Sequence, residues 1–166
     1  MEIKDAKITD ISLIQNIAGK TWRTSFVSVI SSGQIEYMLE KMYATDVLRW
    51  QMSDGNHKYI LIEEEEQVAG FASYELDANE DNHARLHKIF VLPELQRSGA
   101  GSLLLDEVTA RAKEKKNEGL LLSVNRQNPA VDYYLKKGFE IVEEDDIDIG
   151  QGYMMKDYVM FLNLGK

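Results

Sequence analysis

The feature that most constrains this fold is an apolar strand that runs through a short loop straight into a strong helix. The strand covers residues 86–92 and ends at Pro93, because proline cannot donate a hydrogen bond to a β-ladder. The helix is expected over 99–115, where apolar residues recur on one face and basic residues gather in the last turns. Its apolar face consists of Leu104, Leu105, Val108 and Ala112. A strand followed at once by such a helix predicts a sheet with helices packed against it.

The rest of the chain extends this pattern over nearly its whole length. The spacing predicts a strand over 2–8, helices that begin near residues 10, 31 and 45, a hairpin over 58–63 and 67–76 with an acidic turn, a strand over 120–124, a helix that Asn128 caps and Pro129 starts, and strands over 139–149 and 153–162. This order predicts an α/β (α+β) fold with a mixed central sheet and helices on both faces. Because no linker or repeat interrupts it, we expect one domain over 1–166.

Composition excludes several classes of function. The chain has no cysteine, which excludes disulfides, thiolate metal sites and cysteine nucleophiles. Its net charge of −9 would repel a phosphate backbone, so no nucleic acid partner is expected. No apolar run is long enough to cross a bilayer, and the N-terminus does not resemble a signal peptide. We therefore expect no membrane partner and a cytoplasmic location.

Two glycines mark the start of the 99–115 helix, and their position predicts an anion site. Gly99 and Gly101 leave the backbone open to a ligand, and first-turn N–H groups have no partner within a helix. These groups lie at the positive end of the helix dipole, which suits a pyrophosphate, and Arg97 adds a positive charge beside them. The segment has no Walker A pattern, and Leu104 occupies the position where a dinucleotide fingerprint needs a third glycine or alanine.

At this point the chain resembles the GNAT superfamily of acetyltransferases, in two motifs. The first reads Gln96-Arg97-x-Gly99-x-Gly101 and follows a strand that ends Phe90-Val91-Leu92-Pro93. The second is similar to the closing element of the family and comprises Asn125, Asn128, Pro129, Ala130, Tyr134, Gly138 and Phe139. The resemblance implies the GNAT fold and an N-acetyltransferase that uses acetyl-CoA as its cosubstrate, with no metal.

The resemblance also implies which residues hold the coenzyme. Backbone groups of the 89–91 strand would pair with the pantetheine arm, and the backbone of the glycine loop would hold the pyrophosphate. Asn128, with Asn125 as a lesser candidate, would contact the coenzyme, and Tyr134 would stand near the thioester sulfur. The implied contact set is Ile89, Phe90, Val91, Gln96, Arg97, Ser98, Gly99, Ala100, Gly101, Ser102, Asn125, Asn128 and Tyr134.

Acetyl transfer to an amine needs an acid for the leaving thiolate and a base for the ammonium. On the resemblance, Tyr134 is the leading acid, since a phenol with a pKa of about 10 can protonate a thiolate. His87 is the leading base, because strand alternation places its imidazole on the same face as Ile89 and Val91. Glu75, on the preceding strand, is the second candidate, and a chain of water molecules is the alternative to any single base.

The other two histidines, His57 and His83, are expected in loops as surface residues without a role. Acidic side chains of the final hairpin are candidates to attract a cation, although each one alone is more often a solvated residue. They are Asp146, Asp148 and Asp157.

The resemblance implies a primary amine of a small molecule as the acceptor, with direct transfer in a ternary complex. Bacterial polyamine acetyltransferases are similar in layout, so a polyamine is one candidate, and a homodimer is common in the family. Three alternatives stay open. They are a non-catalytic acyl-CoA-binding sensor or partner protein on the same fold, a protein N-terminal or lysine acetyltransferase, and an unrelated phosphate-binding α/β domain.

Overall fold

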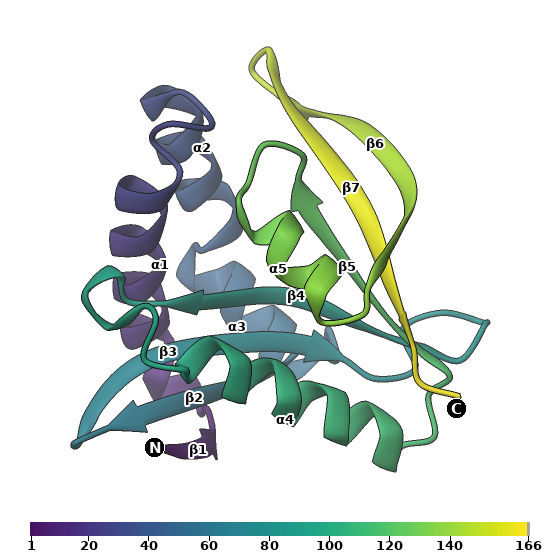
Figure 1. Ribbon diagram of the computed structural model, residues 1–166. Coiled ribbons are helices and arrows are strands. Elements are labelled where there is room, and N and C mark those ends of the chain that lie inside the picture. Colours follow the sequence, from purple (N-terminus) through teal and green to yellow (C-terminus); the bar gives the residue numbers. More distant parts are fainter. Residues whose placement is uncertain (166) are drawn as a thin grey trace. The chain divides into compact units, whose positions relative to one another are not determined.

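The computed structural model describes residues 1–165 as a mixed α/β fold with seven strands and five helices (Figure 1). Two 3₁₀ turns, Ile8–Asp10 and Pro93–Leu95, precede the first and fourth helices. The elements follow in the order β1 (Glu2–Asp5), α1 (Ile11–Ser25), α2 (Ser32–Met42), α3 (Thr45–Ser53), β2 (Lys58–Glu64), β3 (Gln67–Glu75), β4 (His83–Val91), α4 (Ala100–Glu114), β5 (Gly119–Asn125), α5 (Ala130–Lys136), β6 (Glu140–Gly150) and β7 (Tyr153–Asn163). This is the order that the sequence predicts, and the predicted mixed sheet is confirmed.

The strands form one sheet in the order β1-β2-β3-β4-β5-β7-β6. β1, β2 and β3 pair antiparallel, β4 and β5 pair parallel, and β5, β7 and β6 pair antiparallel. The predicted acidic turn joins β2 to β3 through Glu65 and Glu66, both exposed and both with positive φ, 51° and 65°. Positive φ at both central residues is the geometry of a type I′ turn, which follows the twist of a hairpin.

The chain divides into two compact units. Unit 1 contains Met1–Glu75 and His87–Ala110, and unit 2 contains Leu76–Leu86 and the chain from Arg111 on. β4 and α4 each contribute residues to both units. The expectation of one domain over 1–166 stays a prediction.

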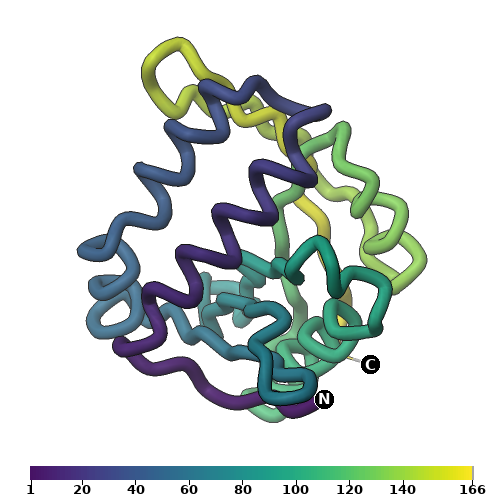
Figure 2. The backbone as a smooth tube through the Cα atoms, turned by 90° about the vertical axis from the view of Figure 1, so that its left-hand side faces the viewer, coloured from purple at the N-terminus to yellow at the C-terminus, as the bar shows by residue number. Residues whose placement is uncertain are grey.

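In unit 1, helices cover both faces of the sheet. Figure 1 shows α3 behind β2 and β3 and α4 in front of them. α1 and α2 run side by side (Figure 2), and an ion pair with an N–O distance of 2.7 Å joins Arg23 to Glu36. The side chains buried in this unit include Ile14, Ile17, Leu48, Ile60, Leu61, Ile62 and Phe71.

In unit 2, β5 is flanked on both edges. It pairs with β4 from His83↔Gly119 to Leu86↔Leu122, and with β7 from Gly119↔Asn163 to Asn125↔Asp157. β6 is the outer strand and pairs with β7 alone in the sheet order. The short helix α5 contacts β5, and its Tyr134 is buried.

The structure differs from the sequence prediction at several element ends. β4 begins at His83, three residues before the predicted start, because its pairing with β5 starts there. Thr45 is the first helical residue of α3 and not its cap, which is Ala44. Among residues 1–165, no helix is both long and apolar enough to cross a membrane.

Candidate functional site

The loop between β4 and α4 has a backbone conformation that suits an anion. Arg97 and Gly99 both have positive φ, 71° and 94°. Because such a φ costs a side-chain-bearing residue about 1–2 kcal/mol, Arg97 is a strained position of the kind that gathers at functional sites. The loop from Gln96 to Gly99 is exposed, and α4 begins directly after it at Ala100. The N–H groups of the first turn of α4 have no partner within the helix, and they lie next to this exposed loop.

The space beside the two glycines is open. A Cβ atom added to Gly99 would meet no heavy atom within 4 Å, and one added to Gly101 would meet only Val91 Cγ2, at 3.8 Å. The protein itself therefore does not require glycine at position 101. The side chain of Ser98 turns back toward the helix, where its hydroxyl accepts a hydrogen bond from the Ala100 N–H at 3.4 Å.

The end of β4 is fixed by hydrogen bonds to its last carbonyl group. The Val91 carbonyl oxygen accepts bonds from the Thr21 hydroxyl at 3.4 Å and from the Gln96 side-chain amide at 3.2 Å. On the β3 side, the Leu92 N–H donates to the Ala69 carbonyl at 2.8 Å. Gly70 is needed there, because an added Cβ would lie 2.5 Å from the Phe90 carbonyl oxygen.

The strand segment predicted to carry the pantetheine arm, Ile89 to Val91, lies beyond the β4–β5 ladder. The last pair in that ladder is Leu86↔Leu122. The Phe90 side chain packs in an aromatic cluster in unit 1, with ring centroids 6.0 Å from Trp22 and 5.9 Å from Phe26.

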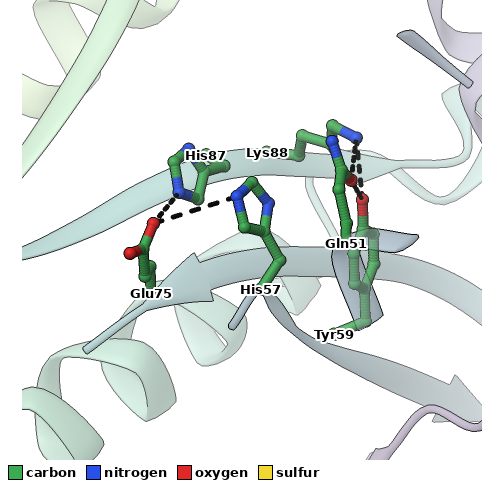
Figure 3. Close-up of polar contacts among 6 residues, drawn as sticks. All are labelled: Gln51, His57, Tyr59, Glu75, His87 and Lys88. Atoms are coloured by element: carbon green, nitrogen blue, oxygen red, sulfur yellow. Dashed lines mark hydrogen bonds and ion pairs between the residues drawn. The ribbon is translucent and has the colours of Figure 1, made fainter. Parts of the chain in front are cut away.

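The two predicted base candidates lie together (Figure 3). His87 Nε2 is 3.1 Å from Glu75 Oε1, and both side chains are half-buried. The same carboxylate oxygen lies 3.8 Å from Nε2 of His57. The imidazole rings of His57 and His87 are stacked, with centroids 4.0 Å apart and planes 4° from parallel. A carboxylate beside an imidazole favours its charged form and fixes its orientation.

His57 was predicted to be a surface residue, and this is wrong. It does lie in the loop before β2, but it is half-buried against His87 and not a surface residue. Burial, and next the charge of His87, lower the pKa of His57 to about 4, so its ring is neutral at pH 7. A signal existed in the hairpin register, since Lys58↔Tyr74 continued by one residue places His57 opposite Glu75. That register depends on a bulge after Ile62, which the sequence does not reveal.

His83 was also predicted in a loop, and this is wrong. It is the first residue of β4, and its ring lies 5.0 Å from that of Phe161.

The three side chains of His57, Glu75 and His87 have ligand atoms within 4.8 Å of one another. Two imidazole nitrogens and a carboxylate oxygen are a donor set that transition metals accept. The expectation that no metal takes part stays a prediction.

A buried lysine occupies the other side of β4. Lys88 Nζ donates to the Tyr59 hydroxyl at 2.7 Å and to Gln51 Oε1 at 3.3 Å, and it lies 4.4 Å from the centre of the Tyr43 ring (Figure 3). Among residues 1–165, no carboxylate forms an ion pair with it, and burial lowers the pKa of Lys88 from its ordinary 10.5 to about 7.

In unit 2, the predicted closing motif forms a turn and a short helix. Asn125 Oδ1 accepts a hydrogen bond from the Gln127 N–H at 2.9 Å, and Asn128 Oδ1 accepts one from the Ala130 N–H at 2.8 Å. The N-cap of α5 is Pro129 and its first helical residue is Ala130, so the prediction that Asn128 caps this helix and Pro129 starts it is wrong by one residue. Because these two oxygens are engaged, the side-chain NH₂ groups of Asn125 and Asn128 are the atoms that could donate hydrogen bonds to a ligand.

Tyr134 is buried in α5, with its ring against those of Tyr133 and Phe139 at 5.5 Å and 5.6 Å. Among residues 1–165, no group forms a hydrogen bond with its hydroxyl. Burial, and to a lesser degree the nearby Tyr133, raise the pKa of Tyr134, so the phenol stays protonated at neutral pH.

The fold is that of known acetyltransferases, as comparisons with other proteins show. The model of the acetyltransferase (GNAT) domain matches residues 26–154. The chain is 27% identical to an uncharacterized N-acetyltransferase, YuaI, of Bacillus subtilis, over 93% of this chain and 88% of the relative. It is 25% identical to a spermidine N(1)-acetyltransferase of Thermoplasma acidophilum, over 89% of this chain and 93% of that protein.

Among solved structures, the PaiA N-acetyltransferase of Thermoplasma acidophilum in complex with coenzyme A has a TM-score of 0.80 to this chain. The two are 23% identical, and the match covers 98% of each chain. The chain belongs to the GNAT acetyltransferase family, and the resemblance seen in the sequence is confirmed. It is an N-acetyltransferase.

Lys88 provides a test of the buried charge. The pKa of Lys88 is lower in the folded protein than in the unfolded chain. Between pH 7 and about 10 the unfolded chain therefore binds more protons at this residue. As a result, the contribution of Lys88 to the free energy of unfolding rises with pH over this range. Lys88→Met removes the titration and the burial cost, while the Tyr59 hydroxyl keeps its bond to Gln51 Oε1 at 2.6 Å. We expect the free energy of unfolding at pH 7 to rise by about 1–3 kcal/mol.

The measurement is chemical denaturation at pH 7, 8.5 and 10, with the wild type in parallel. The difference in the free energy of unfolding between Lys88→Met and the wild type should become smaller as the pH rises. A variant that is less stable at pH 7, with a gap independent of pH, would show that the amine is charged and stabilising.

Proposed function

We propose that this enzyme transfers the acetyl group of acetyl-CoA to a primary amine of a small molecule, by direct attack in a ternary complex. The observation that carries the proposal is the open, glycine-lined start of α4 in a member of the GNAT family. We place the enzyme in the cytoplasm, where acetyl-CoA is available, and leave a homodimer as a second expectation to test.

Coenzyme binding would use the backbone of the loop and of β4. The diphosphate would accept hydrogen bonds from the N–H groups between Gln96 and Ser102, at the positive end of the α4 dipole. The Arg97 guanidinium is exposed in the same loop and adds positive charge in a chain whose net charge is −9. The pantetheine arm would bind along Ile89 to Val91, beyond the last β4–β5 pair.

The chemical step needs an uncharged amine, since an ammonium has no lone pair. In our proposal the substrate ammonium gives its proton to His87, which Glu75 orients and whose charged form Glu75 stabilises. The amine nitrogen then attacks the carbonyl carbon of the thioester. The tetrahedral intermediate collapses with cleavage of the C–S bond, and the departing thiolate takes a proton from the Tyr134 hydroxyl.

His57 fits this scheme as a positioning residue. Its ring is neutral at pH 7, so it does not compete with His87 for the proton of the substrate. The two rings are stacked with their centroids 4.0 Å apart, which restricts rotation of the His87 imidazole. The Nε2 atoms of both histidines lie close to the same oxygen of Glu75, Oε1. Held in this way, the His87 imidazole has one preferred orientation.

Gly101 tests the coenzyme site with little risk to the fold. A Cβ atom has room there, and most residues favour a helix more than glycine does by about 0.5–1 kcal/mol. We therefore expect Gly101→Val to unfold at the wild-type temperature or above. Its Kd for coenzyme A, measured by calorimetry, should rise by about tenfold or more because the side chain blocks the backbone.

Leu103→Val is the matched control, since Leu103 is exposed on the same helix and outside the loop. Unchanged affinity in Gly101→Val would remove the diphosphate from this loop. Gly99 is less suitable for this test, because its φ of 94° would strain any replacement.

Tyr134→Phe tests the proposed acid. Removal of the hydroxyl should lower kcat by about 100-fold, the usual contribution of a positioned acid, and leave the Kd for coenzyme A within about twofold. The assay follows thiol release from acetyl-CoA with a panel of primary amines. Tyr133→Phe, which changes the adjacent tyrosine, should keep wild-type turnover. Equal turnover in Tyr134→Phe would leave this residue a purely structural role.

His87→Gln tests the proposed base in the same assay. We expect kcat/KM for the amine to fall by about 100-fold at pH 7 and to recover partly as the pH rises, because more of the free amine is then present. His83→Gln is the control from the first residue of the same strand. A kcat/KM that is unchanged in His87→Gln would favour a water chain as the route for the proton.

A further inference from the structure

Two histidines and a glutamate from three separate segments of unit 1 converge on one point (Figure 3). His57 directly precedes β2, Glu75 is the last residue of β3, and His87 lies in β4. Their ligand atoms lie within 4.8 Å of one another, and among residues 1–165 no other His, Asp and Glu side chains converge in this way as a group of three. The whole cluster is contained within one compact unit.

The distances within this cluster suit a metal ion that forms short bonds to nitrogen and oxygen. Zinc binds imidazole nitrogen and carboxylate oxygen at about 2.0–2.2 Å in a tetrahedral arrangement, which sets its ligand atoms about 3.3 Å apart. Glu75 Oε1 lies 3.1 Å from His87 Nε2 and 3.8 Å from His57 Nε2, so the two distances lie on either side of that value. Three protein ligands leave the fourth position of zinc to water.

The cluster is held by the backbone and is still open to solvent. The His57 N–H donates to the Gln51 carbonyl oxygen at 3.0 Å, which fixes the loop against the end of α3. The Lys58↔Tyr74 pair holds the next residue to the strand that carries Glu75. The three side chains expose between 16% and 24% of their surface, so a small ion does not need local unfolding to approach them.

Two features make this a site for reversible binding. The imidazole planes of His57 and His87 are 4° from parallel, whereas a shared ion lies in the plane of each ring, because the nitrogen lone pair lies there. At least one ring must therefore turn and give up the stacking. In addition, His57 Nδ1 is buried and has no hydrogen-bond partner among residues 1–165. Ligating histidines usually donate this second N–H, and loss of such a partner weakens metal affinity by about 10–100-fold.

We propose that His57, Glu75 and His87 bind Zn²⁺ or a similar transition-metal ion reversibly, and that the bound ion inhibits acetyl transfer. Imidazole nitrogen selects ions of this class over Mg²⁺ and Ca²⁺, which prefer oxygen ligands. The inhibition rests on the proposed function, since a lone pair of His87 that is bonded to zinc cannot accept the proton of the substrate ammonium. The metal binding itself does not depend on that function, and the ion takes no part in the transfer.

Calorimetry of the metal-free protein with ZnCl₂ tests the site. The wild type should bind one zinc ion at this site, and an excess of MgCl₂ should not displace it. His57→Gln and Glu75→Gln each remove one of three ligands, so the Kd for zinc should rise by about tenfold or more. The chain has no cysteine and three histidines, so His83→Gln, which removes the histidine outside the cluster, is the matched control and should keep the wild-type Kd. Equal zinc affinity in the wild type and in both cluster variants would overturn the site.

Long-range ¹H–¹⁵N spectra of the wild type identify the ligands without any substitution, and so do not depend on whether a variant folds. Zinc should shift the ring nitrogen signals of His57 and His87 and leave those of His83 in place. Saturating zinc that leaves the signals of His57 and His87 unmoved would equally overturn the site.

The inhibition is measured as formation of acetylated n-propylamine by mass spectrometry, because the thiol of released coenzyme A itself binds zinc. Saturating zinc should lower the wild-type rate by about 100-fold, the usual contribution of a positioned base, and EDTA should restore it. In His57→Gln, compared with its own zinc-free rate, the same inhibition should need about tenfold more zinc.

The two measurements separate failure of the site from failure of the proposed function. If no amine is acetylated without zinc, the proposed function fails, while calorimetry and the ring nitrogen signals still decide whether the cluster binds the ion. Zinc bound to the cluster with unchanged turnover would overturn the inhibition, and with it the role of His87 as the base.

Discussion

The arrangement of this protein depends on how β4 ends and α4 begins. The Val91 carbonyl is held by Thr21 and Gln96, and Gly70 lets β3 approach the Phe90 backbone. These contacts fix the point from which the loop leaves the sheet. The positive φ values of Arg97 and Gly99 then turn the chain into α4 with its first N–H groups unpaired within the helix. The coenzyme site that we propose is made of backbone, so it needs no particular side chain and is compatible with the low identity of this chain to its relatives.

Buried titratable groups are the second main feature of the structure. Lys88, His57 and Asp157 each carry a shifted pKa because burial disfavours their charged forms. For Lys88 the cost is partly offset by the Tyr59 hydroxyl and the Tyr43 ring. For His57 a neutral ring serves the proposed base by stacking on it. For Asp157 the charges of Arg126 and Arg85 offset part of the effect of burial.

Much of the fold follows from the sequence, because strands and helices here carry clear periodicities. The apolar stripe of α4, Leu104 to Ala112, is buried as its spacing predicts, and the Glu65–Glu66 turn closes the expected hairpin. The positions of Tyr134, His87 and the glycine loop could be read from motifs and alternation. Their roles remain proposals.

The contacts that could not be predicted from the sequence are those that strand register determines. A bulge after Ile62 brings His57 opposite Glu75, and the pairing of β6 with β7 sets Asp145 against Asp157. A shift by one residue would send either partner to the opposite face of the sheet. The burial of Lys88 likewise follows from where α2 and α3 place Tyr43 and Gln51, two residues far from it in the chain.

In the coenzyme site that we propose, backbone amides at the start of α4 hold the diphosphate. The most direct measurement is titration of ¹⁵N-labelled protein with coenzyme A, followed by amide chemical shifts. If these amides hold the diphosphate, the largest shift changes fall on the loop and first helical turn, from Gln96 to Ser102, and pantetheine alone leaves these amides unchanged. Saturating coenzyme A that leaves those amides unmoved, while others respond, would contradict it.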